Sequence, residues 1–191
     1  MPTRLFPLIA LLCVSCVVYA QSEKRTGKQI YGGYTLLSNS FNGVPGSRQP
    51  LNGWDFAFGF QSWHGLRFKL DTYSYRGSNL GASQNCLFIL AGAQFDRKIG
   101  KEIVFAEVSA GNASVNQNWG PNGHLGENDT FTSLLGGGLD TPLLRHLAFR
   151  VSGGYQYWNF ALLDPVYKTA IQYPGLPNNF GRISSGLVWK F

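Results

Sequence analysis

Residues that could carry out catalysis or bind a metal are few in this sequence and lie far apart. The three histidines are His64, His124 and His146, and none has a second histidine or a cysteine at the spacing of a metal site. A serine nucleophile needs a base within hydrogen-bond reach, but His64 and His146 fall in predicted turns rather than on a strand face. We therefore expect no enzyme activity, no catalytic residues, no metal site and no cofactor.

The run Gly136-Gly137-Gly138 could suggest a phosphate-binding loop. Such a loop continues into a Lys-Ser/Thr pair at the start of a helix, and neither feature follows this run. Close packing or bending within a β wall fits these glycines better.

The charged residues with the most informative spacing alternate with apolar ones. Arg67, Lys69 and Asp71 occupy every second position, which places them on one face of an extended strand. Opposite charges inside a narrow barrel can pair, and pairing offsets the cost of burying them. Such a network either plugs the interior or lines an ion path, and the little room within eight strands favours a plug. The residues predicted to form this lumen network are Arg67, Lys69, Asp71, Glu107, Arg150 and Arg182.

Eight segments with a period of two residues can position these side chains. They cover approximately residues 29–40, 52–63, 65–76, 85–95, 102–112, 130–140, 147–158 and 180–191. At a rise of ~3.3 Å per residue and a tilt of ~40°, each spans roughly 25 Å, the height of an outer-membrane apolar band. After residue 20 no apolar run approaches the ~20 residues of a spanning helix. The facing of 29–40 and 85–95 stays open.

The strand faces opposite the charges carry large apolar side chains. Alternation alone does not say which face is outside, but charges suit a sealed interior and aromatic rings suit lipid. The aromatic residues predicted to face lipid are Trp54, Phe56, Phe58, Phe60, Phe68, Phe149, Tyr155 and Tyr157. The chain ends with Leu187, Trp189 and Phe191 on one face, as expected of a closing strand in a bilayer. The sequence thus predicts an all-β fold, an eight-stranded antiparallel up-and-down transmembrane β-barrel.

Long and short connections alternate along the chain, which is typical of outer-membrane barrels with exterior loops and tight periplasmic turns. The largest predicted loops are 113–129 and 159–178, and Trp119, Tyr167 and Tyr173 are candidate contact points in them. An even strand count places both termini in the periplasm.

The N-terminus has the pattern of a secretory signal. Arg4 precedes an apolar stretch, and Val18-Tyr19-Ala20 fits the small-x-small cleavage motif. We expect residues 1–20 to be the signal peptide and 21–191 the barrel domain. A lipidated Cys16 is the less consistent alternative, because Cys13 stands where that motif requires leucine. The mature chain then keeps Cys86 alone and allows no intramolecular disulfide.

The basic residues of the mature chain are scattered rather than clustered. Removal of residues 1–20 takes away one arginine and no acid, so the mature charge is 15 − 10 = +5. This distribution does not indicate a nucleic-acid partner.

Several motifs together resemble known membrane barrels. They are Tyr31-Gly32-Gly33-Tyr34, Leu51-Asn52-Gly53-Trp54, Gly136-Gly137-Gly138-Leu139-Asp140, Arg145-His146-Leu147-Ala148-Phe149-Arg150 and Ser185-Gly186-Leu187-Val188-Trp189-Lys190-Phe191. The mature chain is similar to small bacterial outer-membrane β-barrel proteins, in particular to the transmembrane domain of the outer-membrane protein A superfamily. The resemblance implies a monomer in outer-membrane lipid, inserted by the barrel-assembly machinery through its aromatic C-terminal strand. The periplasmic peptidoglycan-binding domain of larger members has no counterpart in these motifs.

We therefore expect an integral outer-membrane protein with a structural or surface-interaction role, exerted through four extracellular loops. One alternative is a narrow channel for small or hydrophobic solutes, and a second is a soluble periplasmic ligand-binding barrel. The sequence specifies neither a ligand nor a partner.

Overall fold

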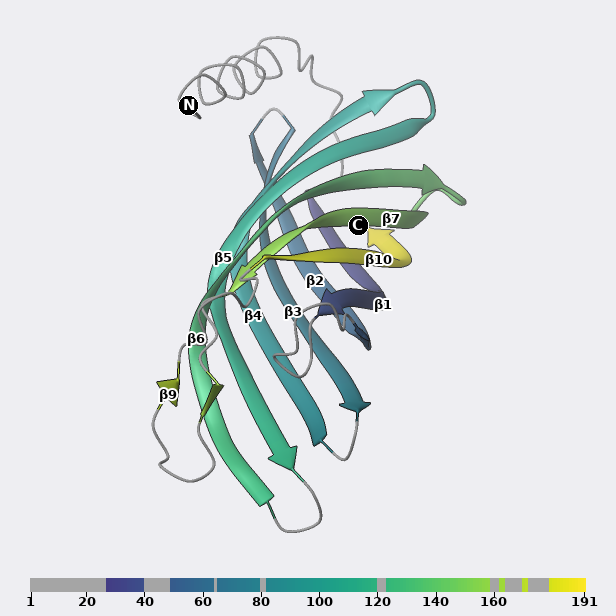
Figure 1. The fold of residues 1–191 in the computed structure, drawn as a ribbon. Helices are drawn as coiled ribbons and strands as arrows, with labels where there is room; N and C mark the ends of the chain where they lie inside the picture. The colour runs from purple at the N-terminus through teal and green to yellow at the C-terminus, as the bar shows by residue number, and fades with distance from the viewer. Residues whose placement is uncertain are drawn as a thin grey trace, which may run out of the picture.

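A computed structural model describes residues 27–39, 49–63, 65–79, 82–119, 123–158, 162–163, 170–171 and 179–191. Eight long strands form one closed barrel (Figure 1). These strands are β1 (Lys28–Asn39), β2 (Gln49–Trp63), β3 (Leu66–Asn79), β4 (Ala82–Ile99), β5 (Glu102–Trp119), β6 (Gly123–Pro142), β7 (Leu147–Trp158) and β10 (Asn179–Lys190). The two-residue strands β8 (Leu162–Leu163) and β9 (Ala170–Ile171) pair only with each other. The predicted fold class is confirmed.

Closure of the barrel depends on the first and last long strands. β1 pairs antiparallel with β10, from Gln29 opposite Lys190 to Ser38 opposite Gly181. Every other neighbouring pair is also antiparallel and consecutive along the barrel. A closed ladder satisfies the backbone hydrogen bonds without leaving an edge, as a structure in hydrocarbon requires. Within the described residues, no helix is long and apolar enough to cross a membrane.

Tight turns join strands at one end of the barrel. Gly65 and Gly100 lie in the β2–β3 and β4–β5 turns with φ angles of 89° and 62°. This left-handed conformation is favourable for glycine because it has no Cβ. Residues 143–146 form the β6–β7 turn at the same end, and the chain also ends there. We call this end the turn mouth and the opposite end the loop mouth.

The prediction of a loop over residues 113–129 is wrong. β5 continues to Trp119 and β6 begins at Gly123, so most of that segment is paired strand, with Val115 opposite Asn128. The sequence of the segment has no period-two run of large apolar residues, and this is why it resembled a loop. In Figure 1 β4, β5 and β6 extend farther toward the lower left than β7, β10 and β1.

The side chains of all three predicted contact points lie outside the described residues. These are Tyr167, Tyr173 and Trp119, and the backbone of Trp119 ends β5. The predicted signal peptide also lies outside them.

The structure decides the facing of the two ambiguous strands. In β1, Tyr31, Thr35 and Leu37 are buried inside the barrel, whereas Tyr34 and Leu36 are exposed. In β4 the buried residues are Cys86, Phe88, Leu90, Gln94 and Asp96, and Leu87 and Ile89 are exposed. Both strands therefore alternate like the others. Toward the loop mouth their inward side chains are apolar, as are their outward ones.

Candidate functional site: the barrel interior and its outer surface

Near the turn mouth, buried arginines pair with acids across neighbouring strands. Arg150 on β7 donates from Nε and Nη2 to the two carboxylate oxygens of Asp140 on β6, at 2.6 and 3.0 Å. Lys190 Nζ donates to the same carboxylate at 2.9 Å. Arg67 donates to Asp96 from Nε at 3.4 Å and from Nη2 at 3.2 Å. A two-pronged arginine–carboxylate contact fixes geometry as well as charge, so these pairs hold adjacent strands in register.

A second group of charges lies in the middle of the interior. Lys69 on β3 pairs with Glu107 on β5 and with Asp71, the latter at 3.1 Å. Ser109 donates to Asp71 at 3.4 Å. The two carboxylates share the ammonium of Lys69, and this compensates the charge of a side chain that is 5% exposed.

Arg182 on β10 makes a third group with Asp55 on β2. Its guanidinium donates to Asp55, which also accepts a hydrogen bond from Ser184 at 2.8 Å. Tyr31 Oη lies 2.6 Å from Ser184 Oγ, and the guanidinium carbon lies 4.2 Å from the centre of the Tyr73 ring. This group bridges the closing pair β1 and β10 to β2.

All six residues of the predicted lumen network are buried, and each pairs with an opposite charge. Lys69 pairs with both Asp71 and Glu107, whereas Arg67, Arg150 and Arg182 pair with acids outside the predicted set. The missed partners are Asp96, Asp140 and Asp55, together with Gln94, which bonds Asp96 and Arg150. Their alternation with outward residues was the signal that could have found them. Which acid meets which base depends on the register between strands.

Toward the loop mouth, apolar and aromatic side chains replace the charges. Phe88 stacks on Trp158 at 5.1 Å between ring centres and on Tyr73 at 4.9 Å. Trp158 also meets Phe180 edge to face at 4.7 Å. The buried cluster consists of Leu37, Leu51, Tyr73, Tyr75, Cys86, Phe88, Leu90, Ala113, Val115, Leu134, Trp158 and Phe180. Rings and ion pairs thus fill successive levels of the interior, as expected for an eight-stranded barrel.

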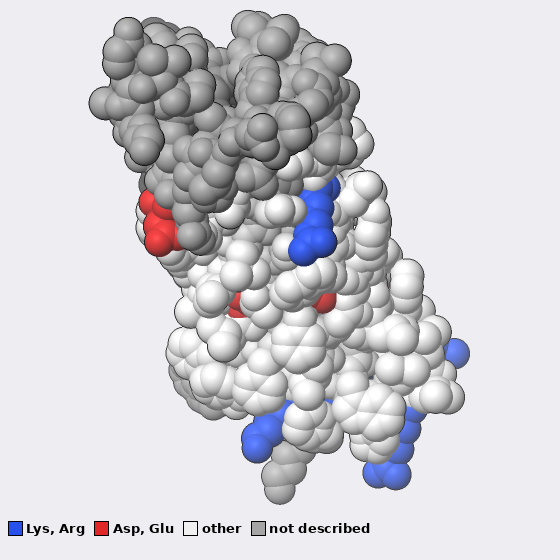
Figure 2. All heavy atoms as spheres, turned by 90° about the horizontal axis from the view of Figure 1, so that it is seen from below, with Lys and Arg blue, Asp and Glu red and all other residues white. Residues whose placement is uncertain are grey.

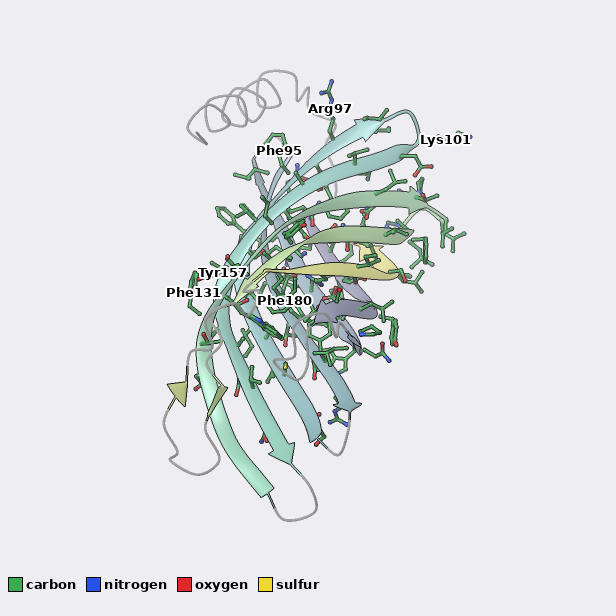
Figure 3. The ribbon with its side chains drawn as sticks, in the orientation of Figure 1. Phe95, Arg97, Lys101, Phe131, Tyr157 and Phe180 are labelled. Carbon is green, nitrogen blue, oxygen red and sulfur yellow. The ribbon has the colours of Figure 1, made fainter. Side chains whose placement is uncertain are left out.

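The outer surface has the opposite character. Twenty-five large apolar or aromatic side chains of the described residues are exposed, among them seven of the eight aromatics predicted to face lipid. Phe58, the eighth, is half-buried on the same face. Figure 3 labels Phe131 and Tyr157, two of the exposed rings, and in Figure 2 a broad, nearly uncharged surface separates groups of charges. This surface is suited to hydrocarbon rather than to water.

The C-terminal strand presents its three predicted signal residues outward. Leu187, Trp189 and Phe191 are 49%, 52% and 45% exposed, respectively. The backbone of Phe191 exchanges hydrogen bonds with Lys28 of β1, so the last residue takes part in barrel closure.

The predicted turn histidines do not join a metal-binding cluster within the described residues. No group of three or more His, Cys, Asp or Glu side chains in them could hold a metal ion. His146 lies in the β6–β7 turn with Nδ1 3.0 Å from the Lys190 carbonyl oxygen, and its ring stacks near Trp189. His64 and the side chain of His124 lie outside the described part of the chain.

Solved structures share this architecture at low sequence identity. Neisserial surface protein A matches with a TM-score of 0.65 and 13% identity, covering 88% of this chain and 100% of that chain. Ail, the attachment invasion locus protein of Yersinia pestis, matches at 0.57 and 13%, covering 87% and 99%. The outer membrane protein OprG from Pseudomonas aeruginosa matches at 0.53 and 14%, covering 87% and 97%.

The chain therefore has the fold of the small bacterial outer-membrane barrels. No protein-family model matches the sequence, and no curated protein matches it either. The structural likeness establishes the fold and leaves the activity to be argued from the residues.

Proposed function

We propose that this protein is an integral outer-membrane barrel with a structural or surface-interaction role, exerted through the segments at its loop mouth. The observation that carries the proposal is the radial order of the wall, with large apolar side chains outside and paired charges inside. Water would favour the reverse order. In lipid, the outer face contacts acyl chains and the ion pairs are sealed from hydrocarbon.

The same order argues against a soluble periplasmic ligand-binding barrel. A soluble barrel buries its apolar face and solvates its charges, yet Leu135 and Tyr155 are 67% and 70% exposed while Asp71 and Arg150 are 0% and 1% exposed. Recovery of the protein from cells in the soluble fraction, without detergent, would support the soluble alternative instead.

The packing of the interior argues against a narrow channel. A solute would have to displace both the charge groups around Lys69 and Arg182 and the rings around Phe88. We expect no discrete conductance steps from the purified protein in planar bilayers. Regular conductance steps would instead support the narrow-channel alternative.

For a surface role, the paired extension of β5 and β6 and the segment 159–178 are the candidate contact regions. The extension is held rigidly by strand pairing as far as Trp119 opposite Gly123. Rigid presentation lowers the entropy cost of binding, which suits a recognition surface. We propose an outward loop mouth, both termini in the periplasm, and a mature chain that begins at Gln21.

Insertion follows from the same proposal. The exposed Leu187, Trp189 and Phe191 would be read by the barrel-assembly machinery, and the finished barrel would be a monomer surrounded by outer-membrane lipid. No nucleic acid, metal or cofactor is part of this function.

Epitope insertion tests both the location and the orientation. One variant carries a tag between residues 119 and 123, and its matched control carries the same tag at Gly100 in the opposite turn. Antibody should label intact cells expressing the first variant only, and both should label after the outer membrane is opened. The folded barrel should also migrate differently on a detergent gel before and after boiling. Labelling of the Gly100 variant alone on intact cells would reverse the proposed orientation.

A further inference from the structure

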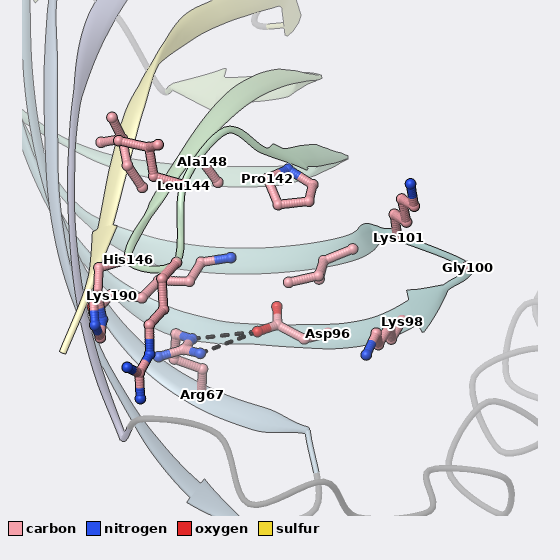
Figure 4. Close-up of a pocket in the computed structure, with 13 residues that line it drawn as sticks. Arg67, Asp96, Lys98, Gly100, Lys101, Pro142, Leu144, His146, Ala148 and Lys190 are labelled. Carbon is pink, nitrogen blue, oxygen red and sulfur yellow. Dashed lines mark hydrogen bonds and ion pairs between the residues drawn. The ribbon is translucent and has the colours of Figure 1, made fainter.

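A cavity of about 520 Å³ opens at the turn mouth, at the opposite end from the proposed surface loops. Its walls come from the β4–β5 turn, the β6–β7 turn, β3 and the end of β10 (Figure 4). Ligand sites in proteins commonly have volumes of about 300–1,000 Å³. The cavity is thus large enough to hold a small polar group together with part of the molecule that carries it.

The charge of the lining is strongly one-sided. Arg67, Lys98, Lys101, Arg145 and Lys190 line the cavity, and Asp96 is the one acid in the lining. Arg67 and Lys190 already contact carboxylates, and Lys98 also has an interaction partner, so the cations left for a ligand are Lys101 and Arg145. Lys190 contacts the carboxylate of Asp140, and the same carboxylate accepts two hydrogen bonds from Arg150. The pairing therefore leaves positive charge in excess.

Arg67 adds an observation independent of the net charge. Its side chain is 3% exposed, and its Nη1 is buried without a hydrogen-bond partner among the described residues. Nε and Nη2 are held by Asp96, which fixes the direction of the guanidinium. A buried N–H group without an acceptor is costly, so this donor indicates a place for an anionic oxygen.

We propose that the turn-mouth cavity binds the phosphate group of a phosphate-bearing ligand. A phosphate offers several charged oxygens, and cations arriving from three separate elements can each reach a different one. A single carboxylate would engage one arginine fork and leave at least one of Lys101 and Arg145 without an acceptor. Ile103, Leu144 and Leu147 line the cavity beside the charges, and they provide contact for the glycerol or hydrocarbon part of an ester.

This chemistry has two possible sources in the periplasm. One is the headgroup of an anionic phospholipid in the inner leaflet, beside which the turn mouth lies in the proposed orientation. The other is a free phosphate ester in solution. Both present the same group to Arg67, and the experiment below separates them.

The test uses the full mature barrel, refolded in a detergent that contains no phosphate. Glycerol 3-phosphate is titrated calorimetrically at constant ionic strength. The test variant combines Lys101→Gln with Arg145→Gln, both in exposed turns lining the cavity. The matched control combines Lys28→Gln with Arg97→Gln, which removes the same charges from exposed positions outside the lining. Figure 3 labels Lys101, in the β4–β5 turn, and Arg97, near the end of β4.

We expect the test pair to weaken binding by about tenfold or more, because it loses two charge-assisted contacts, and the control pair to bind like the parent. Arg67→Lys, which retains a cation for Asp96 but lacks Nη1, should also weaken binding. Retention of the heat-dependent gel shift shows that each variant is folded. Equal weakening in both pairs, or no binding above a chloride control, would overturn the proposal.

Native mass spectrometry separates the two sources. Phosphatidylglycerol and phosphatidylcholine with the same acyl chains are added in turn to the detergent-solubilised protein. Retention of phosphatidylglycerol alone, lost in the test pair, assigns the cavity to a lipid headgroup. Binding of glycerol 3-phosphate without lipid retention assigns it to soluble esters. If neither probe depends on Lys101 and Arg145, the cavity is not a phosphate site.

Discussion

The substitution Val151→Arg tests the outward facing of the wall most directly. Val151 is 46% exposed and is the fifth residue of β7, with Ser185 and Leu139 as its neighbours across the two flanking strands. The strand begins at Leu147, which is opposite the turn-side Trp189. Four residues at ~3.3 Å and ~40° tilt place Val151 roughly 10 Å above that level. This is close to the middle of an apolar band about 25 Å high.

Arginine at the bilayer midplane of a barrel costs ~2–4 kcal/mol. That cost corresponds to a ~30- to ~900-fold change in the folding equilibrium. The matched control is Leu143→Arg, which makes the same kind of change at a residue that is 54% exposed in the β6–β7 turn. Outside the hydrocarbon the cost should stay within ~1 kcal/mol.

Urea titrations of the barrel refolded in phospholipid vesicles, followed by tryptophan fluorescence and gel shift, measure both variants. A cost of Val151→Arg no greater than that of Leu143→Arg would contradict a lipid-facing Val151. Val151 would then face water, and the proposed membrane location would fail with it.

Three further predictions concern the interior and its close contacts. Asp140→Ala leaves the buried charge of Arg150 without its carboxylate and should lower the free energy of unfolding by ~3–5 kcal/mol in the same urea assay. A near-zero change would mean that water replaces the carboxylate. Gly53→Ala would press a Cβ against the Ser74 carbonyl oxygen on β3 and should lower the free energy of unfolding by ~1–3 kcal/mol. Its control, Gly32→Ala, has nothing within 4 Å of the added Cβ and should cost under ~0.5 kcal/mol. Equal costs would contradict the close approach of β2 and β3 at Gly53. Cys86, which is 1% exposed, should resist a polar thiol reagent in the folded barrel and react after unfolding in urea, so rapid labelling of the native protein would indicate an open loop mouth.

The candidate site could be predicted only in part. Alternation predicted that Arg67, Lys69 and Asp71 share one strand face, and their charges predicted that this face is the sealed interior, where all three are buried. The partners of Arg150 and Arg182 did not follow, since pairing across strands depends on register and on barrel closure. The turn-mouth cavity was likewise beyond prediction, because Arg67 and Arg145 lie 78 positions apart in the sequence.

The extension of β5 and β6 could not be predicted from the period-two pattern of the sequence, for a physical reason. The sequence of residues 113–129 has no period-two run of large apolar residues, and such a run is what reveals a strand in lipid. At the start of this segment the two strands are paired, with Ala113 opposite Thr130, and Ala113 also packs in the buried apolar cluster. Backbone hydrogen bonds leave little trace in residue type, so this region resembled a loop.

By itself the sequence determined the number of long strands, the interior facing of the charged residues and the aromatic closing strand. These features arise from local periodicity, which each segment carries independently of the others. Only the tertiary structure decided which acid meets which base, that rings fill the loop-mouth half of the interior, and that five cations surround one cavity at the turn mouth. Those outcomes depend on the stagger of eight strands around a closed ring, a constraint that no single segment contains.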